Sequence, residues 1–197
     1  MRALKYSVLA GLLGVAFSAQ CAPVTYRLDP NHTMVLFSWN HFGFSNPTAD
    51  LGLGEGTLVF DEQQPANSSV QVSLPLSKLD THVPALDKRL KEADFFDAGK
   101  YPTVTFKSTS VQPLGGHKFK VTGDLTVHGV TRSVVLDAIL NKIRAHSTTR
   151  AASIGFDATA TLKRSEFGVG AYVPNVSDAI TIRITTEGSV PKVDAFR

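Results

Sequence analysis

The stretch Ser69-Val-Gln-Val-Ser-Leu-Pro-Leu-Ser77 decides the fold class, because apolar and polar residues alternate along it almost without interruption. Successive side chains of a β-strand point to opposite faces of a sheet, so this period of two is typical of a strand with one buried face. Pro75 has no amide hydrogen to donate, which indicates an edge or a bulge at that point. The stretch therefore predicts a half-buried strand.

The same alternation recurs along most of the chain. Including 69–77, we expect nine strands, the others at 25–29, 34–41, 57–60, 103–108, 118–127, 132–143, 152–162 and 179–187. Gly115-Gly116 marks a hairpin turn. One segment, 84–96, instead places Leu86, Leu90 and Ala93 at helical spacing, which predicts a short amphipathic helix. Many strands, one helical insert and no βαβ alternation predict an all-β antiparallel barrel of about eight strands, because closure removes exposed edges.

Length and composition indicate a single globular domain. The chain has 197 residues, 43% of them hydrophobic, and one cysteine, so no disulfide framework is available. The formal net charge is +3, and two of the basic residues, Arg2 and Lys5, lie in a leader segment. The remaining chain is almost neutral, so we expect no nucleic-acid partner.

The first 22 residues have the layout of a secretory signal peptide. A short basic start precedes an apolar stretch at 8–17 and small residues at 18–22. We therefore expect a signal peptide at 1–22, a mature domain at 23–197 and a periplasmic location. Lipid attachment to Cys21 is the alternative, but Gln20 disfavours it because small residues are wanted before the cysteine. No later stretch is apolar enough to span a bilayer, so we expect no transmembrane segment in the mature chain.

Motifs for catalysis or metal binding are absent from the sequence. It has no acyl-transfer elbow, phosphate loop, HExxH or CxxC, and no two of its six histidines are three to five residues apart. His41 stands out because alternation places it on the same face as Phe37 and Trp39. It is either a hydrogen-bonded core histidine or a polar contact for the head group of a ligand inside the barrel.

Phenylalanine is abundant and is spread over most of the expected strands. These rings either fill the interior of a small barrel or line an elongated apolar cavity for one lipid-like ligand. Alternation alone does not distinguish a filled barrel from a hollow one.

Six blocks of sequence together resemble the YceI-like family over roughly residues 26–190. They are Tyr26-Arg-Leu-Asp-Pro-Asn-His32, Val35-Leu-Phe-Ser-Trp-Asn-His41-Phe-Gly, Leu79-Asp-Thr with Ala93-Asp-Phe-Phe-Asp97, Tyr101-Pro-Thr-Val-Thr-Phe-Lys-Ser108, Gly123-Asp-Leu-Thr-Val-His-Gly-Val-Thr131 and Lys163-Arg-Ser-Glu-Phe-Gly168. The departures are mild, with Thr33 where the family often has Ser and Glu166 where Asp is common. The resemblance implies a periplasmic, lipocalin-like barrel with a tunnel that binds a polyisoprenoid, an isoprenoid quinone or a similar long amphiphile, for transport, storage or sequestration.

The resemblance and the alternation together give a set of expected ligand-binding residues. It comprises Phe37, Trp39, His41, Val72, Leu74, Phe106, Leu125, Val127 and Phe156 facing the tunnel, and Phe95, Phe96 and Phe167 closing it. A one-residue bulge would turn a strand's inward set outward. We expect no required cofactor or metal, and a homodimer is the expected form of any oligomer. Two alternatives to a lipid carrier are an exported stress-related protein that binds a protein partner, and a less favoured enzyme using His41 or His128.

Overall fold

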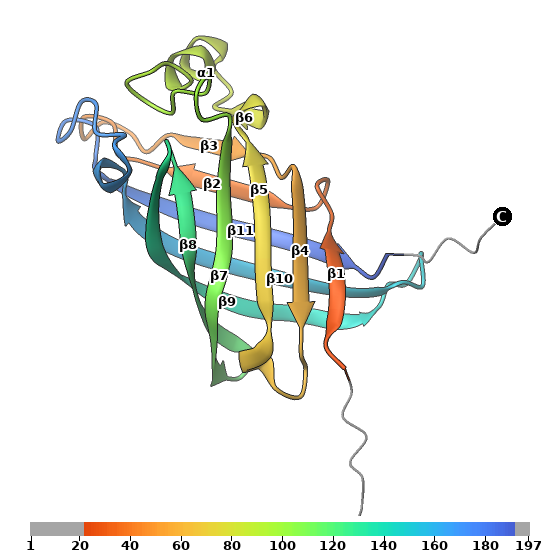
Figure 1. Cartoon of the computed structure of the whole chain (residues 1–197). Helices are drawn as coiled ribbons and strands as arrows, with labels where there is room; N and C mark the ends of the chain where they lie inside the picture. Colours follow the sequence, from red (N-terminus) through yellow and green to blue (C-terminus); the bar gives the residue numbers. More distant parts are fainter. Residues whose placement is uncertain (1–21, 192–197) are drawn as a thin grey trace, which may run out of the picture.

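The computed structural model describes residues 22–191 and consists almost entirely of antiparallel β-structure (Figure 1). The strands are β1 (Val24–Leu28), β2 (Met34–Ser38), β3 (Thr48–Leu51), β4 (Glu55–Phe60), β5 (Ser69–Pro75), β6 (Leu79–Asp80), β7 (Thr103–Gly115), β8 (Lys118–Val127), β9 (Val130–Ala145), β10 (Ala152–Lys163) and β11 (Ala179–Ser189). The helices are α1 (Pro84–Leu90) and three short 3₁₀ turns, η1 (Pro65–Asn67), η2 (Leu76–Lys78) and η3 (Arg164–Phe167). None of these helices is long and apolar enough to cross a membrane.

Eight strands close into a barrel in the order β1, β4, β5, β7, β8, β9, β10, β11 and back to β1. The closing contact is short, because only Arg27 and Leu28 of β1 pair with Ser189 and Gly188 of β11. Earlier in β11, residues 181–185 pair instead with β2. The expected antiparallel barrel with one short helix is confirmed.

At three of the eight strand positions around the barrel, two separate strand segments follow one another in place of a single long strand. β2 continues β1, β3 lies in line with β4, and β6 follows β5, as the pairings of β2 with β3 and of β3 with β6 show. In Figure 1 the first members, β1, β4 and β5, stand upright in the front layer, whereas β2 and β3 lie with the strands that cross behind it. The breaks at 29–33, 52–54 and 76–78 are therefore the corners where the wall passes from one layer to the other.

Gly54 shows why one of these corners requires a glycine. A Cβ atom at this position would lie 2.8 Å from Cδ of Pro75 and 3.0 Å from the carbonyl oxygen of Ser73. The backbone can approach β5 this closely only without a side chain.

The expected nine strands become eleven, and three expected boundaries are wrong by several residues. The strand expected at 103–108 continues to Gly115. β3 and β6 were not expected, and the strand expected at 34–41 ends at Ser38. The helix expected at 84–96 ends at Leu90, and a series of turns covers 91–97. The Gly115-Gly116 hairpin is confirmed, since both residues have positive φ, at 81° and 56°.

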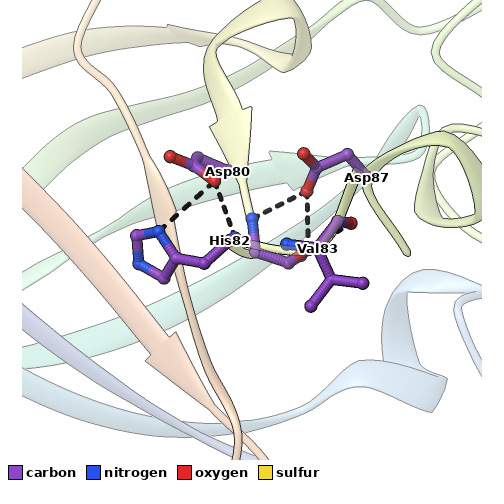
Figure 2. A network of polar contacts seen from close by, with 5 residues as sticks. Asp80, His82, Val83 and Asp87 are labelled. Carbon is purple, nitrogen blue, oxygen red and sulfur yellow. Dashed lines mark hydrogen bonds and ion pairs between the residues drawn. The ribbon is translucent and has the colours of Figure 1, made fainter. Parts of the chain in front are cut away.

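The helix is fixed to the barrel by the polar network drawn in Figure 2. Asp87 of α1 accepts hydrogen bonds from the amide of Thr81, at 2.7 Å, and from its hydroxyl, at 2.6 Å. These bonds hold the pKa of the Asp87 carboxyl below its usual value. Asp80 likewise accepts the amide of His82 at 2.7 Å. The short link between β6 and α1 is thus ordered by two carboxylates, and α1 sits over one end of the barrel (Figure 1).

Candidate functional site

The inward faces of the strands enclose a cavity of about 260 Å³. Its lining is almost entirely aliphatic and aromatic, and it draws on every strand except β6 as well as on η3. Strand β11 shows the pattern most clearly, because Ile180, Ile182, Ile184 and Thr186 face the cavity while the residues between them are exposed. The period of two in the sequence therefore becomes the inside and the outside of the barrel.

The barrel is hollow, and the burial of its inward side chains shows this independently of the volume. Ile182 and Ile184 of β11 and Ala158 and Ala160 of β10 are only half-buried although they point into the barrel. In an interior filled at native packing density such residues would be fully buried. The small side chains of Ala158 and Ala160 on β10 help to leave this space open. Alternation alone did not distinguish a filled barrel from a hollow one, and the structure shows a hollow one.

Nine of the expected ligand-binding residues lie together in the cavity wall. They are Phe37, Val72, Leu74, Phe96, Phe106, Leu125, Val127, Phe156 and Phe167. Phe96 comes from the turns that follow α1, and its ring meets that of Phe37 edge-on, with centroids 6.4 Å apart. The helical insert therefore contributes one aromatic side chain to the wall.

The other three expected residues lie outside the cavity wall. Trp39 follows the end of β2 and packs on Phe37, with ring centroids 5.8 Å apart. Phe95 faces Tyr172 at 6.2 Å, and His41 is exposed. Alternation failed for Trp39 and His41 because the chain leaves the sheet after Ser38 and turns back on itself, with the amide of His41 donating to the carbonyl of Ser45 at 2.8 Å.

A small number of polar side chains also line the cavity, and sequence reasoning did not single them out. The hydroxyl of Thr33, in the link between β1 and β2, and that of Thr186 in β11 form a hydrogen bond of 2.7 Å. Both residues continue an alternating inward series, Thr33 with Val35 and Thr186 with Ile184, so parity could have found them.

Arg164 is the one charged residue among the described residues that line the cavity, and only 9% of its surface is exposed. Its Nε donates to the carbonyl of Ser177 at 2.9 Å, Nη1 to that of Val169 at 2.7 Å, and Nη2 to that of Val176 at 2.8 Å. Burial lowers the pKa of the guanidinium, and the nearby carboxylate of Asp178 partly opposes that effect. Arg164 thus ties the loop at 168–178 to the end of the barrel.

The residues brought together here suit apolar binding. The cavity is lined by a few serine and threonine hydroxyls, but by no histidine, aspartate or glutamate that could take a proton from one of them and make it a nucleophile. Within residues 22–191 no three metal-ligating side chains come together, and His128 instead packs edge-on against Tyr101 at 5.2 Å. The arrangement can remove a long apolar molecule from water.

Comparison with known proteins places this barrel in a family. The YceI-like domain model matches residues 26–188. The protein YceI of Escherichia coli O157:H7 is 34% identical over 179 residues, covering 91% of this chain and 93% of the relative. Among solved structures, BcnA of Burkholderia cenocepacia superposes with a TM-score of 0.73 at 24% identity, covering 81% of this chain and 98% of BcnA.

A second solved structure, a polyisoprenoid binding domain from Saccharophagus degradans, superposes with a TM-score of 0.64. It is 13% identical and covers 84% of this chain and 98% of that domain, so the likeness is one of fold. The family model and the Escherichia coli relative both extend over most of the chain. The chain therefore belongs to the YceI-like domain family.

Proposed function

We propose that this protein is exported to the periplasm and holds a polyisoprenoid or an isoprenoid quinone in its cavity, for transport, storage or sequestration. The observation that carries the proposal is the hollow barrel with an almost wholly apolar lining. The fold shared with a polyisoprenoid binding domain supports the class of ligand, and the leader at 1–22 supports export. Family membership and the lack of a base in the lining favour a binding protein over an enzyme.

The energetics favour a long ligand over a short one. Burial of apolar chain contributes about 0.8 kcal/mol per CH₂, or about 3–4 kcal/mol per isoprene unit. Association costs about 4–15 kcal/mol before any net affinity appears. Two units would therefore barely offset that cost, whereas about five units leave a surplus near the 8 kcal/mol of micromolar affinity. We expect affinity to rise steeply with the number of isoprene units.

The experiment tests the proposal by placing a large side chain inside the cavity. Ala158 lines the cavity and is only half-buried, so Ala158→Phe places a ring in the space that the ligand would occupy. Thr159→Phe is the matched control, because Thr159 is the next residue of β10 and its side chain is exposed. Wild type and both variants are purified from the periplasm, examined by native mass spectrometry, stripped with organic solvent and titrated with farnesol, geranylgeraniol and a long-tailed ubiquinone.

We expect wild type and T159F to carry one lipid per chain and to prefer the longer probes. A158F should be folded and bind at least tenfold more weakly. If A158F retained lipid at the wild-type stoichiometry, or if wild type bound none of the probes, the proposal would be wrong.

A further inference from the structure

Two loops lie side by side at one end of the barrel, and we call them together the aromatic lip. They are residues 39–47, between β2 and β3, and residues 168–178, between η3 and β11 (Figure 1). The amide of Phe42 donates to the carbonyl of Asn175 at 2.8 Å, and that of Ser177 to the carbonyl of Asn40 at 2.9 Å. A backbone bridge joins His41 to Val176. The lip is therefore one hydrogen-bonded unit.

The lip exposes large apolar side chains to an unusual degree. Phe44 is 90% exposed, Tyr172 59%, Phe42 48% and Val173 39%. Phe42, Phe44 and Tyr172 are the only aromatic side chains among the large hydrophobic residues that the structure exposes within 22–191. Single exposed apolar residues are common on protein surfaces, but a cluster on adjoining loops marks an interaction site.

The lip also lacks free charge. Its two loops contain one charged residue, Asp178, whose carboxylate accepts both the amide and the hydroxyl of Ser165, at 2.8 and 2.7 Å. The polar residues of the first loop are neutral amides and hydroxyls, and His41. A surface of aromatic rings and neutral polar groups matches the interfacial zone of a bilayer with zwitterionic lipids, where amphipathic rings partition and a charge has no role.

The lip is continuous with the wall of the cavity. Phe37 lines the cavity and packs on Trp39, which opens the first loop, and Arg164 lines the cavity and holds the second loop through three carbonyls. The ring of Tyr172 in the lip also packs against that of Phe95, and its hydroxyl oxygen lies 3.5 Å from Nη2 of Arg89 in α1. Residues of the cavity wall and of the lip are therefore in direct contact at this end of the barrel.

We propose that the aromatic lip inserts into the interface of a neutral lipid bilayer and docks the cavity against it, an inference that rests on the proposed lipid-carrying function. Docking is driven by burial of Phe42, Phe44 and Tyr172. It therefore needs no anionic lipid and is insensitive to salt.

The test uses vesicles of phosphatidylcholine with brominated acyl chains. Trp39 is the chain's single tryptophan and adjoins the lip, so bromine quenches its fluorescence only when the lip enters the bilayer. Wild type is compared with the double variant Phe42→Ser, Phe44→Ser. The control is Leu114→Ser, which removes a large apolar side chain that is as exposed as that of Phe42 and lies far from the lip, beside the Gly115-Gly116 hairpin. All three proteins are recovered from the periplasm with the same N-terminus, so any contribution of the leader cancels.

We expect wild type and L114S to sediment with the vesicles and to show quenching that is unchanged between about 0.1 and 1 M NaCl, where surface charge attraction would be screened. The double variant should bind at least tenfold more weakly, yet carry the same lipid load in native mass spectrometry. Absence of wild-type binding, equal binding by the double variant, or a requirement for anionic lipid would each overturn the proposal. So would loss of self-association in the double variant without any vesicle binding, since a second copy of the chain would then be the occupant.

The two proposals can fail separately. If wild type carries lipid but ignores vesicles, the lip assignment fails and the carrier function stands. If wild type binds vesicles through the lip but neither carries nor accepts prenyl probes, the carrier function fails instead.

Discussion

Gly123 of β8 lies diagonally opposite Phe106 of β7, and the Phe106 ring occupies the space that a side chain at 123 would need. A Cβ atom there would lie 2.4 Å from Cζ of Phe106 and 2.7 Å from the carbonyl oxygen of Lys107. Carbon atoms in contact are normally about 3.5–4.0 Å apart, so Gly123→Ala must displace the ring by about 1 Å. The ring can turn, but the Lys107 carbonyl belongs to the paired backbone of β7 and β8 and cannot move freely.

We expect Gly123→Ala to destabilise the fold by about 1–3 kcal/mol, the usual cost of inserting a methyl group into packed surroundings. For a domain of this size that lowers Tm by about 2–12 °C. Urea and thermal unfolding measure the loss. Because Phe106 lines the cavity, the displaced ring should also weaken binding of prenyl probes.

The matched control is Gly155→Ala in β10, where the nearest atom to a new Cβ is a carbonyl oxygen of Thr186 at 3.8 Å. That variant should stay within about 0.5 kcal/mol of wild type. Adding Phe106→Leu to G123A should recover part of the loss, with a coupling energy of about 0.5–3 kcal/mol. If G123A and G155A unfolded at the same urea concentration, the close contact would not exist and the reasoning would be refuted.

Two further predictions concern the end of the barrel that carries α1 and the lip. Arg164→Lys loses the fork that reaches three carbonyls in 169–177, so it should cost about 2–4 kcal/mol and speed amide exchange in that loop. Lys163→Met, beside it on the surface, should change unfolding by less than about 0.5 kcal/mol, and equal effects of the two would contradict the role given to Arg164. Hydrogen bonds from Thr81 lower the pKa of Asp87, so its ionised form should stabilise the docking of α1 fully above the ordinary carboxyl pKa of about 3.9 and lose that effect as pH falls through the lower folded value. Asp87→Asn should therefore weaken the dependence of unfolding on pH between about 5 and 2, whereas an unchanged pH profile would show that this carboxylate does not contribute.

The residues that line the barrel wall could be predicted from the sequence, because one face of each long strand is apolar and the other is polar. Val72 and Leu74 in β5 alternate with polar neighbours, and both line the cavity as parity predicts. The same reasoning holds for Phe156 in β10, even though β10 contains an irregularity in register between Gly155 and Phe156. In a regular strand with one face toward solvent, the alternation itself shows which side chains point inward.

The corners and the lip could not be predicted in this way, because they depend on pairing between distant segments. The chain leaves the sheet after Ser38 through bonds to Ser45 and to the 175–177 region. Gly43 and Asn46-Pro47 mark a turn nearby, but they do not show that the strand stops before His41. Arg164 lies inward by parity, two residues after Leu162, but the strand was expected to end at Leu162, so the inward series was not carried on to Arg164. Its three carbonyl partners come from a loop whose position only the folded chain defines.

The closure of the barrel by β11 constrains how the protein can acquire its shape. β11 is the last strand in the chain, and it pairs with β10 just before it and with β1 and β2 at the start. A chain still being synthesised, or one cut before Ala179, is an open sheet whose two edges have no partner. The final contacts span almost the whole chain, so a high contact order and slow folding follow. Until residues 179–189 are in place there is no enclosed space, and the capacity to hold a ligand arises in one step with the last strand.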